Sequence, residues 1–352
     1  MVGDRSVSSS SSSFYRGLSE TYLAALEALT NQSEGNWWRD VLARRDLVIA
    51  IRAEYLNVYY RGASIFRVER EGNRLVPTTH AKYLTRRKQG SVTLAADGTF
   101  NIDPDTALWR TYEGPATLRE MIKAADALTG PEKIGLHGLL LASPHVIDVE
   151  VAFSAIAPLT TEDSKDGLVA AAQEEAGELA QAPLPSAAGG ADRIDVATLE
   201  EQDGEVRIVF HEAKHFANPE LRASAGETPR VAEQIDRYRR TLAHHANAIS
   251  QSYRDVCQAL ALIDAMRRRV QTGTPALAPL HPLISRVANS GTPPTVDPEP
   301  RLVIFGFDKD QRDGTIWQSH FKRLTDTSGH GFGLKVHAVG NTLGRRSPAF
   351  TA

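Results

Sequence analysis

Residues 193–214 read RIDVATLEEQDGEVRIVFHEAK, and this stretch decides the fold. Asp203-Gly204 is a favoured two-residue turn, because both central positions of a type I′ turn need a positive φ, which Asp and Gly tolerate. Runs rich in apolar and β-branched residues flank the turn on both sides. The sequence therefore predicts a β-hairpin with its turn at Asp203 and Gly204.

The hairpin predicts which side chains lie opposite one another. A two-residue turn fixes the register, and in this register Asp195 lies directly across from Glu212. Opposite residues share a face and lie ~5 Å apart at Cβ, where like charges are destabilising unless a cation lies between them. The alternation of side chains along a strand places Lys214 on the same face as Glu212. Two acids and one amine are therefore expected to converge.

This set of side chains suits a divalent cation. The carboxylates of Asp195 and Glu212, together with the Ala213 carbonyl, offer the hard oxygen ligands that Mg²⁺ prefers. A bound metal acidifies its water and acts as a Lewis acid, and Lys214 would orient the nucleophile or stabilise charge on a phosphate. These residues favour phosphodiester hydrolysis. The alternative that they leave open is an edge hairpin with unrelated surface charges, in which Lys214 is an ion-pair partner.

The same residues carry a family resemblance. Asp195, followed by Glu212-Ala-Lys214 at the end of the next apolar strand, resembles the bipartite motif of the PD-(D/E)XK nuclease superfamily. Gln234 and Tyr238 in the following helix resemble the QxxxY element of the RecB-like branch of that superfamily. The order and spacing of all three parts agree with the family pattern.

The resemblance covers roughly residues 145–340 and implies an α/β fold with a restriction-endonuclease-like αβββαβ core and a mixed sheet. It implies a divalent-metal-dependent nuclease in which Asp195 and Glu212 hold Mg²⁺, or Mn²⁺ as a substitute. Lys214 would act at the nucleophile, with the Gln and Tyr of the helix near the substrate. The preference for DNA over RNA comes from the resemblance alone. Whether cutting is internal or from an end is left open.

Some positions of the family pattern are not fixed by the match. No Gly or Pro immediately precedes the motif aspartate; Arg193 and Ile194 stand there instead. The family also carries a further acid that binds metal, and Glu150, Glu175 and Glu178 are the candidates. Glu150 is preferred, because its strand should adjoin the hairpin.

The helical element allows two interpretations. Gln234 and Tyr238 are four residues apart and therefore share one helix face. Tyr238 also falls in the apolar seam of that helix, so packing in the core is an alternative to substrate contact. Arg193 and Arg237 are candidate phosphate contacts, because guanidinium groups match phosphate geometry. A solvated helix face is the alternative for Arg237.

Two other functions compete with the nuclease. His211-Glu212-Ala-Lys-His215 spells the HExxH signature of zinc metallopeptidases, whose chemistry requires a helix so that residues four apart reach one zinc ion. Here the segment continues a predicted strand, on which Glu212 would face away from both histidines. A non-cleaving nucleic-acid-binding module is the other alternative, and the complete Asp, Glu and Lys set disfavours it.

Composition sets wider limits. The 352 residues allow two modest domains, and 41% hydrophobic residues exclude disorder as the main state. The net charge of −3 argues against a surface coated in positive charge for nonspecific nucleic-acid binding. The single cysteine, Cys257, fits a reducing compartment, so a cytoplasmic location is expected. No apolar run is long enough for a membrane span, and a homo-oligomer is left open.

Patterns along the chain predict its organisation. Residues 1–13 form a Ser-rich disordered tail, residues 14–130 a smaller α+β N-terminal domain of unknown role, and residues 131–352 the nuclease-like domain. An Ala-, Glu- and Pro-rich stretch at residues 158–191 is interpreted as an insertion. A long helix or two consecutive helices should extend from residue 228 towards residue 270, and a Pro-rich connection should follow at residues 275–300.

Overall fold

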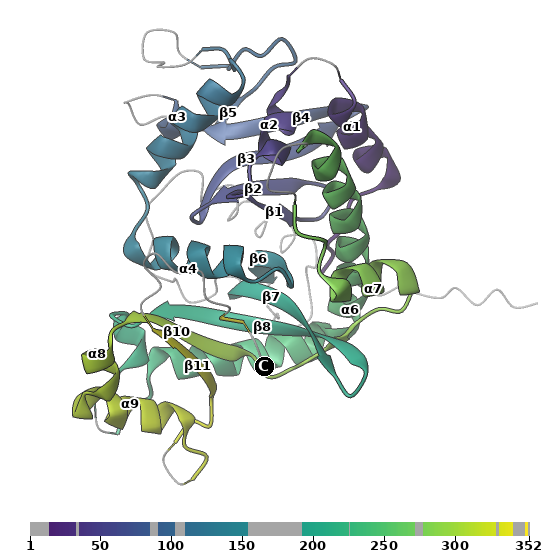
Figure 1. Ribbon diagram of the computed structural model, residues 1–352. Coiled ribbons are helices and arrows are strands. Elements are labelled where there is room, and N and C mark those ends of the chain that lie inside the picture. Colours follow the sequence, from purple (N-terminus) through teal and green to yellow (C-terminus); the bar gives the residue numbers. More distant parts are fainter. Residues whose placement is uncertain are drawn as a thin grey trace, which may run out of the picture.

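The computed structural model describes residues 14–32, 35–84, 91–102, 110–153, 192–224, 226–271, 277–328, 331–340 and 349–350. These residues form two β-sheets and the helices that cover them (Figure 1). The α/β class and the mixed sheet expected from the sequence are confirmed. The predicted tail, the predicted insertion and the candidates Glu175 and Glu178 lie outside the described residues.

The first sheet lies near the N-terminus and has five strands in the order β1-β2-β3-β4-β5, each antiparallel to its neighbour. They are β1 (Val48–Ile51), β2 (Leu56–Tyr60), β3 (Ala63–Glu71), β4 (Arg74–His80) and β5 (Ser91–Thr93). Around this sheet lie α1 (Glu20–Thr30), α2 (Trp37–Ala43), the short 3₁₀ helix η1 (Ala81–Tyr83) and α3 (Pro115–Asp126). Polar residues start the first two helices: Ser19 accepts from the Tyr22 N–H, and Asn36 caps α2.

The second sheet follows the order β11-β10-β8-β7-β6, and the short strand β9 (Thr295–Val296) pairs with β8. Its members are β6 (Val146–Phe153), β7 (Asp192–Gln202), β8 (Glu205–His215), β10 (Arg301–Phe307) and β11 (Lys335–Gly340). Neighbours among β6, β7 and β8 are antiparallel, whereas β10 is parallel to both β8 and β11. The parallel pairing is possible because the long helix α6 (Arg230–Val270) carries the chain back between β8 and β10.

The hairpin has the predicted turn and register. Asp203 and Gly204 have φ values of 54° and 81°, as a type I′ turn requires. The pairs run from Gln202 opposite Glu205 at the turn to Val196 opposite His211. The turn chemistry therefore sets the alignment along nearly the whole length of both strands.

Helices cover both faces of the second sheet. Leu136 and Leu139 of α4 (Pro131–Ala142) pack against one face, where they meet Val303 and Phe305. The first half of α6 covers the opposite face (Figure 1). The remaining elements in the described residues are three helices and one 3₁₀ turn: α7 (Pro282–Ser290), α8 (Lys309–Asp313), α9 (Thr315–Thr325) and η2 (Pro219–Leu221). The expectation of a plain connection at residues 275–300 is wrong, since α7 and β9 lie within it; Pro282 is compatible with the helix because it occupies the first turn, where proline is tolerated.

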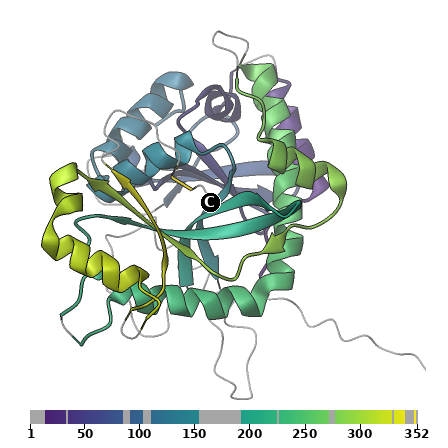
Figure 2. The same ribbon diagram turned by 60° about the horizontal axis from the view of Figure 1, so that its bottom comes forward.

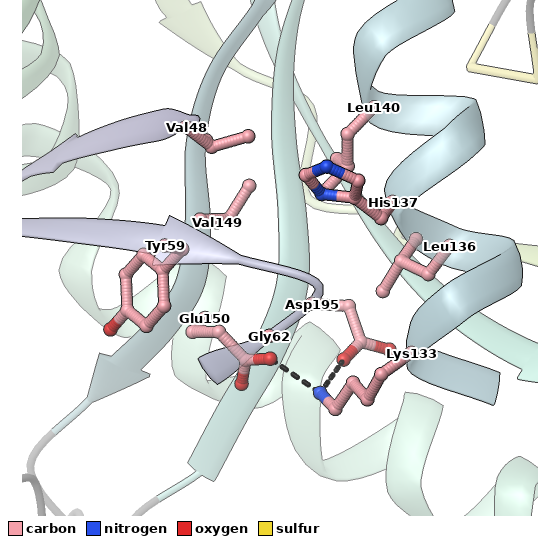
Figure 3. Close-up of a pocket in the computed structure, with 10 residues that line it drawn as sticks. All are labelled: Val48, Tyr59, Gly62, Lys133, Leu136, His137, Leu140, Val149, Glu150 and Asp195. Atoms are coloured by element: carbon pink, nitrogen blue, oxygen red, sulfur yellow. Dashed lines mark hydrogen bonds and ion pairs between the residues drawn. The ribbon is translucent and has the colours of Figure 1, made fainter. Parts of the chain in front are cut away.

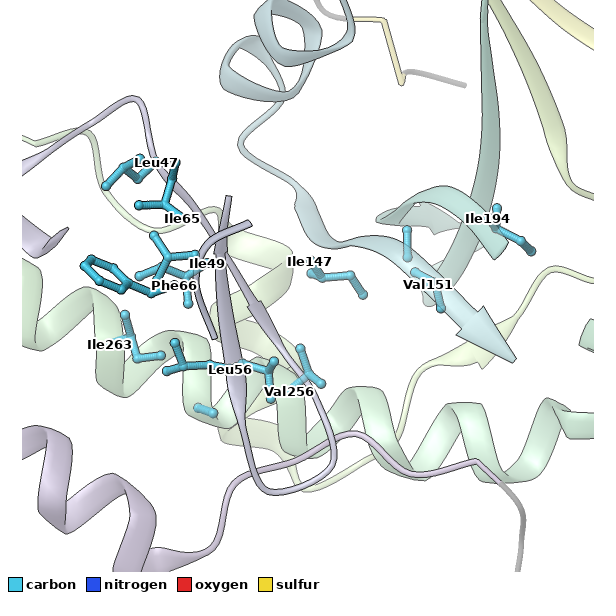
Figure 4. Packing of buried hydrophobic residues seen from close by; sticks show 14 of the residues in the cluster. Leu47, Ile49, Leu56, Ile65, Phe66, Ile147, Val151, Ile194, Val256 and Ile263 are labelled. Carbon is cyan, nitrogen blue, oxygen red and sulfur yellow. The ribbon is translucent and has the colours of Figure 1, made fainter. Parts of the chain in front are cut away.

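Helix α6 links the two sheets. It is one helix rather than two, and it changes direction so that its second half extends to the first sheet (Figure 2). There Val256 and Ile263 belong to the same buried cluster as Ile49, Leu56 and Phe66 (Figure 4). Each such side chain contributes about 1.5–3 kcal/mol when fully buried. The two sheets therefore share one hydrophobic core. None of the helices in the described residues has both the length and the apolar character needed to cross a bilayer.

Candidate functional site

Three acids meet on adjacent strands of the second sheet. Glu150 comes from β6, Asp195 from β7 and Glu212 from β8. The residue pairs on either side place Glu150 across from Asp195. Asp195 lies near enough to Glu212 to raise the pKa of that carboxyl. The structure therefore brings together the two predicted metal ligands and the preferred candidate for a further acid.

A lysine that the sequence did not single out lies between two of these acids. Lys133, in the first turn of α4, forms an ion pair with Glu150, and its Nζ is 3.9 Å from Asp195 Oδ1 (Figure 3). The three side chains line a small pocket between α4, β6 and the first sheet. Arg193 lies beside them, with its Nη1 atom 4.0 Å from Glu150 Oε2.

The Asp195 side chain turns toward the main chain of β8. Its Oδ2 atom accepts a hydrogen bond of 2.8 Å from the Ala213 N–H. Burial raises the pKa of Asp195, and Glu150 adds to this rise while Lys133 opposes it. For Glu150 burial acts in the same direction, but Lys133 and Arg193 outweigh it and lower the pKa. One ammonium therefore favours the charged form of Glu150 more than that of Asp195.

Glu212 is the most strongly perturbed carboxyl of the site. Its side chain is 4% exposed, and Oε1 lies 2.8 Å from Lys214 Nζ. The other oxygen, Oε2, is buried without a hydrogen-bond partner. Burial and the nearby Asp195 raise the pKa of Glu212 to about 8, despite the ammonium of Lys214. The orphaned oxygen and the raised pKa both indicate that negative charge is incompletely balanced here.

Lys214 lies on the same face as Glu212, as the strand alternation predicts, and is held by two carboxylates. Its Nζ is 2.8 Å from Glu212 Oε1 and 2.6 Å from Glu220 Oε2, in the turn η2. Burial opposes the charge of this amine, but Glu212 and Glu220 outweigh burial and raise the pKa of Lys214 above its usual value. Lys214 is therefore an ammonium at neutral pH.

Gln234 and Tyr238 reach the same region from α6. Gln234 Nε2 donates a hydrogen bond of 2.6 Å to the Tyr238 hydroxyl, which in turn donates to the Arg193 carbonyl. Tyr238 is 1% exposed, so its ring packs in the core while its hydroxyl ties α6 to β7. Arg237 lies on the exposed side of the helix and pairs with Asp192, at 3.4 Å.

The histidines of the HExxH string do not form a metal site in this structure. Residues 211–215 belong to strand β8, not to a helix. His211 Nε2 is 2.9 Å from Thr198 Oγ1, and the His215 ring packs edge-on against Phe305. Across the described ranges, no three His, Cys, Asp or Glu side chains are placed to ligate one ion. The helix that zinc-peptidase chemistry requires is therefore absent at this string.

Several residues of this region had no local signal in the sequence. Lys133 stands in an ordinary helix start, and Glu220 stands in a short turn. Glu132 accepts from the His215 N–H at 3.0 Å and from the Asn218 amide at 3.1 Å, so it fixes the chain just beyond Lys214. Each of these contacts depends on how helix α4 and the η2 turn pack against the strands.

Comparisons with known proteins identify no relative. No protein-family model, no curated protein and no solved structure matches the chain. The function is therefore inferred from the site residues and their geometry.

Proposed function

We propose that this protein is a divalent-metal-dependent nuclease that hydrolyses phosphodiester bonds, with DNA as its preferred substrate. The observation that carries the proposal is the meeting of Asp195, Glu212 and Lys214, with Glu212 buried and one of its oxygens orphaned. The order α4, β6, β7, β8, α6 and then, after α7 and β9, β10 supports it, because this order is compatible with the αβββαβ core that the sequence resemblance implies. The preference for DNA still comes from that resemblance.

The residues present fit a divalent cation. Asp195, Glu212 and the Ala213 carbonyl would hold it, since hard oxygens are the ligands that Mg²⁺ and Mn²⁺ prefer. A cation there would satisfy the buried Glu212 Oε2 and balance the charge that raises the pKa of Glu212. Glu150 is not included in this ligand set, because Lys133 already forms an ion pair with it. The set therefore contains two carboxylates, those of Asp195 and Glu212. Positions for water and a phosphate oxygen remain in a set of this size.

The side chains have distinct roles in this proposal. A bound divalent cation supplies Lewis-acid polarisation of the phosphodiester and lowers the pKa of a water molecule. Lys214 stays protonated, so it donates hydrogen bonds to the attacking water or to a phosphate oxygen and does not act as a general base. Gln234 and Tyr238 orient the start of β7, through the Arg193 carbonyl.

A cleavage assay tests the proposal. Linear, circular and single-stranded DNA and RNA are incubated with Mg²⁺ or Mn²⁺ and with wild-type, Asp195→Asn or Lys214→Met protein. We expect each substitution to lower the cleavage rate by about 10²-fold or more, because each removes a charge that acts on the reacting groups. Glu201→Gln is the matched control, since Glu201 is an exposed acid on the same strand.

The outcomes are distinct. Full cleavage by Asp195→Asn protein would remove the mechanism, provided that circular dichroism shows the wild-type fold. Tight binding of DNA or RNA with no cutting in either metal would favour a non-cleaving binding module. Stoichiometric zinc that is lost on substitution of His211 would favour a zinc site instead.

A further inference from the structure

The backbone of Glu150 has an unusual conformation for a strand residue. Its φ is 52°, in the left-handed region, although Glu150 lies inside β6. A non-glycine residue in this region costs about 1–2 kcal/mol, so it persists only where the surroundings determine it. The conformation therefore needs a structural cause.

The conformation changes where the Glu150 side chain points. In a regular strand, consecutive side chains point to opposite faces. Here Val149 and Glu150 both line the pocket between α4 and the first sheet (Figure 3). The register with β7 also shifts between Val146 and Asp148. With this backbone the Glu150 carboxylate pairs with Lys133, whose Nζ also lies 3.9 Å from Asp195 Oδ1.

Arg52 binds the main chain at this irregular point. Its Nη2 atom donates to the Val149 carbonyl at 2.7 Å and to the Glu150 carbonyl at 3.4 Å. Its Nη1 atom donates to Asp148 Oδ1 at 2.6 Å, and the same oxygen accepts from the Val149 N–H at 2.8 Å. Tyr253 of α6 donates to the other Asp148 oxygen at 2.9 Å. Both the guanidinium and this carboxylate are fully buried.

Arg52 is itself fixed by the first sheet. It follows β1 directly, and its N–H donates to the Tyr55 carbonyl at 2.8 Å. Its carbonyl accepts from the Gly17 N–H at 3.0 Å. The position of the guanidinium is therefore set by the N-terminal part of the chain, to which the sequence assigned no role.

We propose that Arg52 is a positioning residue of the candidate active site. Its guanidinium is anchored on Asp148, binds the carbonyls of Val149 and Glu150, and holds the left-handed backbone that presents the Glu150 carboxylate to Lys133 and Asp195. The expected effect on catalysis rests on the proposed nuclease function, whereas the effect of Arg52 on the Glu150 backbone does not. The N-terminal sheet is then an integral part of the active centre.

The fork of donors explains why arginine is needed. A guanidinium carries five N–H donors in a fixed plane, so it binds the carboxylate and the two carbonyls together. A lysine at this position would keep the charge that Asp148 needs but could not reproduce the fork. Arg52→Lys therefore separates charge balance from positioning, and Arg52→Met removes both.

Arg16 provides a matched control. It is also a buried arginine near the same carboxylate, with its Nε atom 3.9 Å from Asp148 Oδ2. It donates to the Ala152 carbonyl at 3.1 Å, beyond the irregular segment. Arg16→Met therefore removes a cation next to Asp148 without removing a bond to the Glu150 main chain.

The test combines crystal structures of the three variants with cleavage kinetics in Mg²⁺. In Arg52→Met and Arg52→Lys we expect Glu150 to leave the left-handed region and its ion pair with Lys133. We expect kcat to fall about 10²-fold with KM unchanged, because Lys133, once released from Glu150, would pair more closely with the proposed metal ligand Asp195, and small displacements at such a group have effects of this size. Arg16→Met should keep both the Glu150 conformation and kcat. In a Glu150→Gln background, Arg52→Met should lower kcat no further.

Every outcome decides the inference. An Arg52→Lys structure with Glu150 unchanged overturns it, and so does an equal loss of kcat in Arg16→Met. If Arg52→Met does not fold, Arg52→Lys still provides the test, because it keeps a positive charge beside the buried Asp148 carboxylate. If the wild-type chain cleaves no substrate, the proposed nuclease function fails, and the crystal structures still decide whether Arg52 positions Glu150.

Discussion

Lys133 and Glu150 form an ion pair across the pocket between α4 and β6, and Lys133 is also 3.9 Å from Asp195. One ammonium therefore balances two carboxylates from adjacent strands. Lys133 is 39% exposed, whereas Glu150 is 10% exposed, so solvent screens the amine more than the acid. Loss of this amine leaves two partly buried acids next to each other.

Lys133→Met should lower stability in a pH-dependent way. Lys133 helps to lower the pKa of Glu150, so its stabilisation is present above the ordinary pKa of 4.5 and is lost as pH falls below it. We expect a loss of about 1 kcal/mol in the free energy of unfolding at pH 7, and a smaller loss at pH 4. Urea unfolding at both pH values measures the difference. Lys123→Met, at an exposed lysine of α3, is the control, and equal losses at both pH values would contradict the prediction.

Lys133→Met should also bind a divalent cation more tightly than the wild type does. Lys133 competes electrostatically with any cation held by Asp195 and Glu212, and its removal leaves the site more negative. We expect the affinity for Mn²⁺, measured by calorimetry, to rise by up to about tenfold, which corresponds to about 1.4 kcal/mol. Weaker binding by Lys133→Met protein of unchanged fold would argue against a metal at this place.

Glu212→Gln should change how stability depends on pH. The pKa of Glu212 is raised from 4.5 to about 8 by burial and Asp195, so the folded protein holds a proton that the unfolded chain releases. The free energy of unfolding of the wild type should therefore fall as pH rises from about 4.5 to about 8, by at most ~1.4 kcal/mol per pH unit. Glu212→Gln lacks this titration, so its free energy of unfolding should rise relative to that of the wild type as pH increases from about 5 to about 7.5. Parallel curves for the two proteins would contradict the raised pKa; Glu201→Gln is the control.

Two glycines of α4 should respond in opposite directions to alanine. A Cβ at Gly135 would lie 2.5 Å from the Phe305 ring, whereas a Cβ at Gly138 would meet nothing within 4 Å. Gly138→Ala should stabilise the protein by about 0.5–1 kcal/mol, because alanine favours helix interiors. Gly135→Ala should destabilise it by about 1–3 kcal/mol, because the close packing on β10 leaves no room. Thermal unfolding of both variants measures the contrast, and equal effects would show that α4 does not pack this closely.

The amino-acid sequence determined the features that depend on neighbouring residues. The Asp203-Gly204 turn set the hairpin register, because two positions with positive φ admit few residue types. The apolar spacing from residue 231 onward predicted helix α6, although its length as a single helix was left open. The convergence of Asp195 with Glu212 and Lys214 follows from that register and from strand alternation.

Tertiary structure alone decided the surroundings of those residues. Arg52 meets Asp148 across 96 positions of the chain, and its contact depends on how the two sheets pack. Glu150 departs from the alternation expected of any regular strand, because buried hydrogen bonds hold its backbone in the left-handed region. Local patterns act over a few residues, whereas ion pairs and burial depend on segments that come together when the core forms. The acids and Lys214 were therefore predictable from the sequence, whereas Lys133, Glu220 and Arg52 were not.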